Sequence, residues 1–191
     1  AMLLLNSQST FSAFTSLANL LNNELLMVFY GLNQNKMRII YSYYDRQFHS
    51  LLPDLASHFV NIGLTTDLFF MYQVYTLFAR SLSLDCVSRV WDIFLRDGNE
   101  FIFRASLGLL SMFKNELIKL EFIDSARFLS NLPEDMDMEK YFEIIASIKL
   151  VPPKLSTLLA TDVINQTIII TNDSNTAKSR YSLFMNKIWR F

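Results

Sequence analysis

The side chains best suited to acid–base chemistry form an acidic cluster directly after Pro133. The cluster consists of Glu134, Asp135, Asp137 and Glu139. Paired carboxylates can divide general acid and general base work between them, so a hydrolytic site is one interpretation. We favour a second interpretation, in which these charges mark the start of a helix, because negative charge interacts favourably with the N-terminal end of the helix dipole.

Other reaction and nucleotide-binding motifs are absent from the sequence. It contains neither G-x-x-x-x-G-K-[S/T] nor G-x-G-x-x-G, the loops that cradle phosphates, and no G-x-S-x-G nucleophile elbow. His49 and His58 lack an H-E-x-x-H spacing, and an edge-of-core or surface position is expected for both. Cys86 is the only cysteine, which excludes an internal disulfide and a metal site built from several thiolates. We expect no metal site and no cofactor. The net charge of −1 gives no indication of nucleic-acid binding.

The stretch 82–98 contains both the start and the end of a helix. Ser83 is placed to cap the first turn, and Gly98 is placed to end the helix because glycine accepts a positive φ. Arg89 and Asp92 lie beside the apolar stripe, so we expect both to pair with neighbouring polar groups. The stripe itself has helical spacing and consists of Val87, Val90, Trp91, Phe94 and Leu95.

The scarcity of turn residues predicts an all-α fold. Four glycines and four prolines in 191 residues are too few for the many turns of a sandwich or barrel. A hydrophobic content of 51% is enough to build a substantial core. We expect a helix break at Asn22–Asn23 and another at Pro53. The expected helical segments are 11–30, 37–50, 52–62, 68–81, 84–97, 101–120, 122–129 and 137–150.

The pair Pro152-Pro153 is the best candidate for a boundary in the chain. It separates a domain over residues 1–150 from a C-terminal tail over residues 151–191. Within the tail, residues 180–191 carry apolar side chains at helical spacing beside Arg180, Lys187 and Arg190. Such a basic amphipathic helix can pack on the domain, lie on a membrane surface or dock on a partner. Packing on the domain is the default expectation.

Several short motifs follow one another in a characteristic order. They are Leu52-Pro53-Asp54-Leu55, Gly63-Leu64-Thr65, Tyr75-Thr76-Leu77-Phe78, Arg89-Val90-Trp91-Asp92, Asp97-Gly98 and Leu132-Pro133-Glu134-Asp135. In this order they resemble the latter part of the TBC domain, the domain of Rab GTPase-activating proteins. The resemblance covers residues 1–150, and Arg-Val-Trp-Asp before Asp-Gly is its most informative part. It implies an irregular multi-helix, all-α domain, of which this chain is the C-terminal portion.

The resemblance implies a GTPase-activating protein for Rab-type small GTPases, which themselves hold the GTP and Mg. In this family an arginine from I-x-x-D-x-x-R stabilises charge on the phosphates, and a glutamine from Y-x-Q positions the attacking water. Neither motif occurs in this sequence. Both would lie upstream of Ala1, so we expect no catalytic residue, no enzyme activity of the chain itself and inactivity in isolation. The alternative is a non-catalytic helical module that binds a GTPase or an adaptor.

The resemblance also assigns roles to individual residues. It implies that Arg89, Trp91, Asp92, Asp97 and Gly98 hold the scaffold together without touching substrate. On another segment, Gln73 stands where the family often has tryptophan, so we expect Tyr72 and Gln73 to face the GTPase.

The resemblance further bears on the location and partners of the chain. It implies a cytoplasmic protein of vesicle trafficking, and it leaves open peripheral association with endomembranes. The apolar start of the chain reads as the inside of a helix, so core surface would be exposed there. Self-association is therefore open as well.

Overall fold

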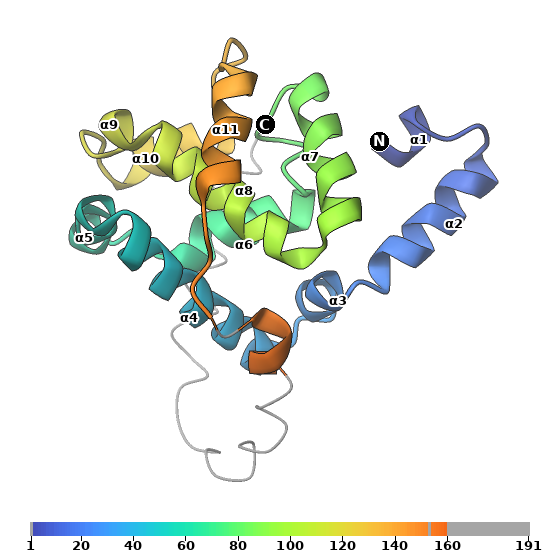
Figure 1. Ribbon diagram of the computed structural model, residues 1–191, viewed down its shortest axis with the longest axis horizontal. Coiled ribbons are helices and arrows are strands. Elements are labelled where there is room, and N and C mark those ends of the chain that lie inside the picture. The colour runs from blue at the N-terminus through green and yellow to red at the C-terminus, as the bar shows by residue number, and fades with distance from the viewer. Residues whose placement is uncertain (1, 153, 160–191) are drawn as a thin grey trace, which may run out of the picture. The chain divides into compact units, whose positions relative to one another are not determined.

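Helices form the regular structure throughout residues 2–152 and 154–159, the part of the chain that the structure describes (Figure 1). The computed structural model contains no strand among these residues, which confirms the expected all-α fold. The helices with defined bounds are α1 (Met2–Leu5), α2 (Thr10–Leu21), α3 (Glu24–Tyr30), α4 (Gln34–Leu51), α5 (Pro53–Ile62), α6 (Thr66–Thr76), α7 (Leu84–Asp97), α8 (Asn99–Met112), α9 (Lys114–Leu117), α10 (Phe122–Ser130) and α11 (Met138–Ser147).

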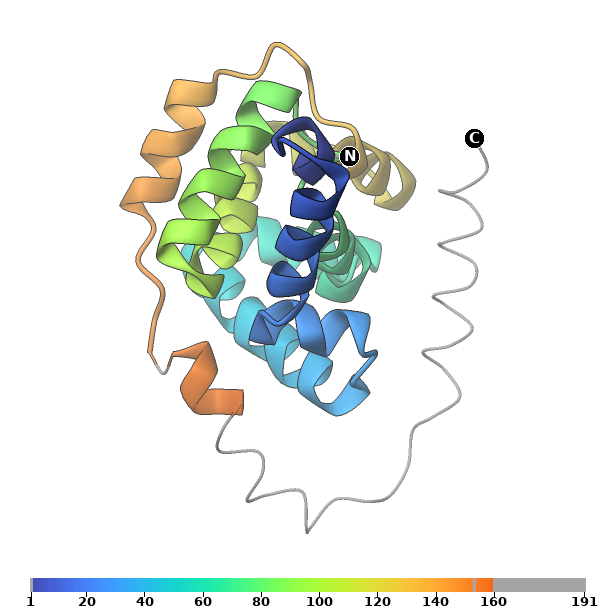
Figure 2. The same ribbon diagram turned by 90° about the vertical axis from the view of Figure 1, so that its right-hand side faces the viewer.

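Helices α1 and α2 form an N-terminal arm, which Figure 2 shows in blue in front of the other helices. The arm ends at Asn22, where the chain turns into α3, so the expected break at Asn22–Asn23 is confirmed. Polar side chains cap the starts of α2 and α3. Ser9 Oγ accepts a hydrogen bond from the N–H of Ser12 (3.1 Å), and Asn23 Oδ1 accepts one from the N–H of Leu25 (3.0 Å). Each cap satisfies a backbone donor that the first helical turn leaves free.

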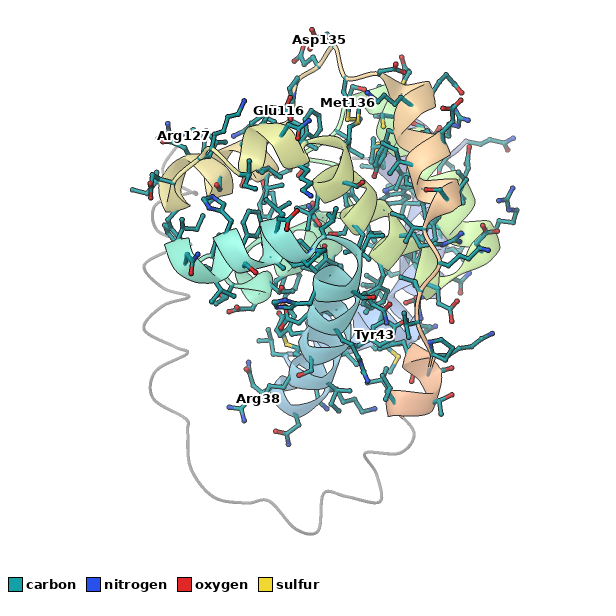
Figure 3. The ribbon with its side chains drawn as sticks, turned by 60° about the vertical axis from the view of Figure 1, so that its left-hand side comes forward. Arg38, Tyr43, Glu116, Arg127, Asp135 and Met136 are labelled. Atoms are coloured by element: carbon teal, nitrogen blue, oxygen red, sulfur yellow. The ribbon has the colours of Figure 1, made fainter. Side chains whose placement is uncertain are left out.

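Aromatic side chains of α4, α6 and α8 fill the core. The ring of Tyr44 on α4 lies 4.3 Å from that of Phe70 on α6, and Phe70 lies 5.2 Å from Phe103 on α8, measured between centroids. Tyr43, labelled on α4 in Figure 3, meets Phe103 edge-on at 5.2 Å. All four rings are buried, and each such pair adds about 0.5–1.5 kcal/mol beyond simple burial. The aromatic cluster therefore ties together three helices that are distant in sequence.

A small residue lets α8 and α11 approach each other closely. These two helices lie side by side in Figure 1, and α8 packs mainly against α11 and α7. A Cβ atom on Gly108 would lie 2.8 Å from Cγ1 of Ile145 and 3.2 Å from Cε2 of Tyr141. The hydroxyl of Tyr141 donates to the carbonyl of Ala105 at 3.0 Å. Any larger residue at position 108 would therefore displace side chains of α11.

Helix α6 ends earlier than the sequence pattern predicts. The apolar pattern runs to Ser81, whereas the helix stops at Thr76. Leu77 and Phe78 then adopt left-handed backbone conformations, with φ of 44° and 62°. The N–H of Phe78 donates to the carbonyl of Gln73 at 3.0 Å, which satisfies an acceptor at the helix end. Non-glycine residues seldom adopt positive φ, and no glycine marks this turn in the sequence.

The chain divides into two units, residues 1–152 and 153–191, so the division falls within the Pro152-Pro153 pair. In the second unit, the basic amphipathic segment expected over residues 180–191 lies outside the described residues. In the first unit, Figure 3 marks α9 and α10 by Glu116 and Arg127, and the following connection by Asp135 and Met136. Across residues 2–152 and 154–159, we find no helix with the length and apolar character needed to cross a bilayer.

Candidate functional site

Arg89 links α7 to the start of α11. Its Nη1 donates to Glu139 Oε1 at 2.6 Å, and its guanidinium carbon lies 4.2 Å from the centroid of the Phe142 ring. The Arg89 side chain is about half exposed and that of Glu139 is largely exposed, so the ion pair contributes little, and the stacking adds about 0.5–1 kcal/mol. Beside it, Asp137 Oδ1 caps α11 by accepting from the N–H of Lys140 at 3.0 Å. Two members of the acidic cluster therefore serve the first turn of α11.

Trp91 links α7 to the end of α6. Its indole Nε1 donates to the carbonyl of Leu77 at 2.9 Å, so it fixes the left-handed turn that follows α6. The ring is only partly buried, because it also lines two cavities beside the N-terminal arm. A fully buried tryptophan costs roughly 3–5 kcal/mol when truncated to alanine, so a smaller loss is expected here.

Asp97 and Gly98 form the turn between α7 and α8. Asp97 accepts hydrogen bonds from Arg96 Nε at 2.6 Å and Nη2 at 3.1 Å, and Arg104 Nη2 of α8 lies 3.7 Å away. The hydrogen bond from Arg96 lowers the pKa of the Asp97 carboxyl below its ordinary value of 3.8. Gly98 has φ 82° and ψ −163°, a region that only glycine occupies readily. The expected helix stop at Gly98 is therefore confirmed, and this backbone conformation explains the residue type.

Two expectations for α7 are wrong. Ser83 stands at the N-cap position, but its hydroxyl accepts no capping hydrogen bond from the first turn of α7. Asp92 is exposed and forms no hydrogen bond or ion pair with any residue of the described chain. Both side chains are exposed, so solvent is available to them and neither needs a protein partner.

The expected GTPase-facing position of Gln73 is also wrong. Its side chain is 0% exposed, and that of Tyr72 is 7% exposed, because α6 is surrounded by other helices. Burial raises the pKa of the Tyr72 hydroxyl. A residue without accessible surface cannot contact a partner in this conformation. Residue 73 therefore belongs to the core and forms no part of the surface.

A buried hydrogen-bonded chain surrounds Gln73, and sequence reasoning missed it. Tyr44 Oη lies 2.7 Å from Ser106 Oγ, and Ser106 Oγ donates to Gln73 Oε1 at 2.5 Å. Complete burial of Tyr44 raises the pKa of its hydroxyl far above the ordinary value. Gln73 Nε2 has no hydrogen-bond partner within the described structure. These hydrogen bonds join α4, α8 and α6. In the sequence, their one indication is Gln73, a polar residue within the largely apolar helix α6.

An apolar groove separates the N-terminal arm from α7. It comprises two cavities of about 540 and 570 Å³. Both are lined by Leu3 and Leu20 of the arm and by Trp91 of α7. Phe14 and Leu17 of the arm extend the lining of the first cavity. A groove of this size is in the range of sites that bind small molecules or side chains.

The two histidines lie apart from these features. His58 Nε2 lies 2.9 Å from the carbonyl of Leu120, and His49 is exposed at the end of α4. The described residues contain no cluster of three or more His, Cys, Asp or Glu side chains able to hold a metal. The arrangement around α7 brings together helices α6, α8 and α11, and the contacts of Arg89, Trp91 and Asp97 are those of a scaffold.

Comparison with known proteins identifies the fold that this scaffold supports. The family model of the Rab-GTPase-TBC domain matches residues 1–118, from the N-terminal arm to the end of α9. The chain belongs to this family. The resemblance expected from the ordered motifs is thereby confirmed. The TBC match includes the Arg-Val-Trp-Asp stretch, the Asp97-Gly98 turn and the apolar groove.

Relatives in the TBC family span more sequence than this chain. TBC1 domain family member 14 of Bos taurus is 41% identical over 150 residues, which are 78% of this chain and 22% of that protein. TBC1 domain family member 12 of Xenopus tropicalis is 40% identical over the same shares. The chain thus spans about a fifth of the length of these relatives.

A solved structure supports the fold independently. The crystal structure of the Ypt/Rab-GAP domain of Gyp1p matches with a TM-score of 0.52 and 22% identity. The match covers 58% of this chain and 35% of the Gyp1p chain. At this identity the likeness concerns the fold alone, and it agrees with an all-helical TBC domain.

The family match corrects one expectation. From the absence of both finger motifs we expected that the chain would be no enzyme. TBC domains accelerate GTP hydrolysis, which is a catalytic-activator role, and the chain is a member of that family. The absence of the two finger motifs from this sequence therefore does not exclude a catalytic-activator role, because the family match indicates one.

Proposed function

We propose that the chain acts in a GTPase-activating protein for Rab-type small GTPases and supplies the C-terminal helical part of the domain. The observation that carries this proposal is the family match over residues 1–118. The GTPase partner holds the GTP and Mg, and this part of the domain holds the scaffold on which catalytic groups are placed.

In this proposal the arginine and glutamine that promote hydrolysis come from sequence other than residues 1–191. The sequence contains neither I-x-x-D-x-x-R nor Y-x-Q, which supports this assignment. Phosphoryl transfer depends on positive charge placed at the phosphates and on an oriented water, so the scaffold alone accelerates the reaction little. An arginine finger contributes roughly 10³- to 10⁵-fold in rate.

Arg89, Trp91, Asp97 and Gly98 take structural roles in this proposal. The contacts of Arg89 with α11, of Trp91 with the turn after α6, and of Asp97 with Arg104 of α8 support it. Asp92 has no such contact within the described residues, so it remains a candidate for contact with a group outside them. A cytoplasmic location in vesicle trafficking, with peripheral association at endomembranes, follows from the family and remains a prediction.

Single-turnover GTP hydrolysis by a panel of Rab GTPases tests the proposal. The rate is measured for each Rab alone, with this chain, and with this chain plus a polypeptide that carries both finger motifs. The matched control is the same polypeptide with the motif arginine and glutamine replaced by alanine. We expect acceleration only when the intact finger polypeptide and this chain are both present.

The other outcomes separate the competing interpretations. Acceleration by this chain alone would show that its own residues supply the catalytic groups. If the finger polypeptide gives no acceleration while the chain still binds a GTP-loaded Rab or an adaptor, the non-catalytic interaction module is the better description. The missing finger motifs favour this second candidate. Gln73 gives it no support, because its side chain is buried.

A further inference from the structure

An extended segment follows α11 and ends the first unit. We call residues 148–152 the strap, and in Figure 1 it runs from the end of α11 past α4. Ile148 has φ −74° and ψ 120°, so the helical conformation ends there, although its N–H still donates to the carbonyl of Ile145 at 3.2 Å. Within the described part of the chain, no backbone–backbone hydrogen bond involves residues 149–152. Side chains must therefore hold most of the strap in place.

One buried side chain pairs with both backbone groups of a strap residue. Gln47 Nε2 donates to the carbonyl of Val151 at 2.9 Å, and the N–H of Val151 donates to Gln47 Oε1 at 2.7 Å. Gln47 lies on α4 and is only 3% exposed. A buried amide is unfavourable without partners, and here both of its polar atoms are hydrogen-bonded. The pair joins α4 to a residue 104 positions away in the sequence.

Apolar packing adds little to this attachment. The side chain of Ile148 is buried and that of Leu150 is half-buried, whereas the other three strap side chains are exposed. A cavity of about 60 Å³ remains between the strap, α4 and Leu107 of α8. Detaching the strap beyond Ile148 therefore breaks few apolar contacts. The two hydrogen bonds of Gln47 are a large part of what opposes such a local opening.

We infer that Gln47 is the latch of a local opening, in which the strap detaches from α4 and returns while the helices stay folded. Because the Gln47 amide pairs with backbone groups, the latch does not depend on the side chain at position 151. Opening uncovers the Gln47 amide and the small cavity, and it releases the last residues of the first unit. The inference goes beyond the proposed function and does not rest on it, because the opening needs no GTPase.

Limited trypsin digestion of the full chain, with each cut identified by mass spectrometry, tests this inference. The informative bond is Lys149–Leu150 in the strap, and Lys140–Tyr141 in the first turn of α11 is the internal reference. Each rate is divided by the rate at the same bond in a peptide of residues 136–156 with the same sequence, because this ratio reports the open population. In the native chain we expect cleavage at Lys149 to be at least about 5-fold slower than in the peptide, since two hydrogen bonds oppose opening.

The main variant removes both hydrogen bonds of the latch. Each bond contributes roughly 2- to 12-fold to the opening equilibrium, so Gln47→Leu should raise the open population roughly 5- to 150-fold, up to the peptide rate. The matched control is Gln73→Leu, because Gln73 is also a buried glutamine but lies on α6. Neither variant should change the ratio at Lys140.

A second pair of variants acts on the strap and leaves the core untouched. Val151→Pro removes the N–H that donates to Gln47 and should raise the open population roughly 2- to 12-fold. Val151→Ala keeps both backbone groups, so the open population should stay within about 2-fold of the native value. Val151 is 46% exposed, so both variants are expected to fold.

Three results contradict the inference. The first is a native chain that trypsin cuts at Lys149 as fast as it cuts the peptide. The second is equal acceleration by Gln47→Leu and Gln73→Leu, or equal acceleration at Lys140 and Lys149, since either indicates a general loss of stability. The third is a Val151→Ala variant that opens as much as Val151→Pro. If Gln47→Leu loses its helical signal in far-UV circular dichroism, the two Val151 variants decide the question.

Discussion

Removing a single hydroxyl, with Ser106→Ala, should destabilise the first unit more than replacing the larger Gln73 with leucine. Ser106 Oγ is the central group of the buried chain, since it contacts both Tyr44 Oη at 2.7 Å and Gln73 Oε1 at 2.5 Å. All three residues are fully buried. Without the hydroxyl, Tyr44 Oη and Gln73 Oε1 both lose their side-chain hydrogen-bond partner at once.

The magnitude follows from the number of polar groups left without partners. A buried group that loses its hydrogen bond costs about 1–3 kcal/mol, so Ser106→Ala, which leaves two such groups unpaired, should cost about 2–6 kcal/mol. Gln73→Leu instead removes the amide nitrogen that already lacks a partner in the described structure. It leaves Ser106 and Tyr44 bonded to each other, so its net cost should stay within about 1 kcal/mol.

Urea unfolding followed by far-UV circular dichroism measures the free energy of unfolding of each variant. The control is the triple variant Tyr44→Phe, Gln73→Leu, Ser106→Ala, which removes every member of the chain and should be close to the native protein. The reasoning is refuted if Gln73→Leu costs more than Ser106→Ala, or if the triple variant is less stable than Ser106→Ala alone.

Three further predictions concern the turn after α7 and the buried thiol. Gly98→Ala should lower the free energy of unfolding by about 1–3 kcal/mol, and by more than Gly63→Ala does in a paired denaturation experiment. The reason is that Gly98 (φ 82°, ψ −163°) occupies a backbone region that excludes side chains, whereas Gly63 (φ 75°, ψ 19°) does not. The pKa of Asp97 is lowered in the folded chain, so the stability that its carboxylate contributes is complete above the ordinary value of 3.8 and is lost as pH falls through the lowered pKa. Asp97→Asn should therefore flatten the fall of Tm in acid. An unchanged dependence of Tm on pH would contradict this. Burial raises the pKa of the Cys86 thiol to about 11, so a thiol reagent at neutral pH should react with it only after urea unfolds the chain, and rapid reaction of the folded protein would show that the site opens.

Local signals in the sequence were enough to predict most helix ends. Asn22–Asn23 and Pro53 marked breaks because asparagine and proline act on the backbone next to them, and Gly98 marked a stop for the same reason. The position of Gln73 depends on Ser106, a residue 33 positions away, and no local pattern contains that pairing. Helix α6 is buried around most of its surface, so its pattern does not distinguish a core face from a partner face.

The end of α6 and the role of Trp91 show the same limit. Leu77 and Phe78 adopt positive φ without a glycine, and the indole of Trp91 from the next helix stabilises that turn. The sequence predicted Trp91 as part of an apolar stripe, which describes its ring but not its hydrogen bond. The direction of a polar atom on an apolar side chain depends on the tertiary arrangement, and sequence periodicity carries no information on it.

The close contact of α8 with α11 restricts how this domain can diverge. Because a Cβ at position 108 would lie 2.8 Å from Cγ1 of Ile145, the two positions share one volume. Alanine at 108 requires Ile145 to shift or to be replaced by a smaller side chain. Selection is therefore expected to act against the single exchange at 108, whereas a paired exchange at 108 and 145 is tolerated. Among descendants of this sequence, positions 108 and 145 should covary, with total side-chain volume nearly constant.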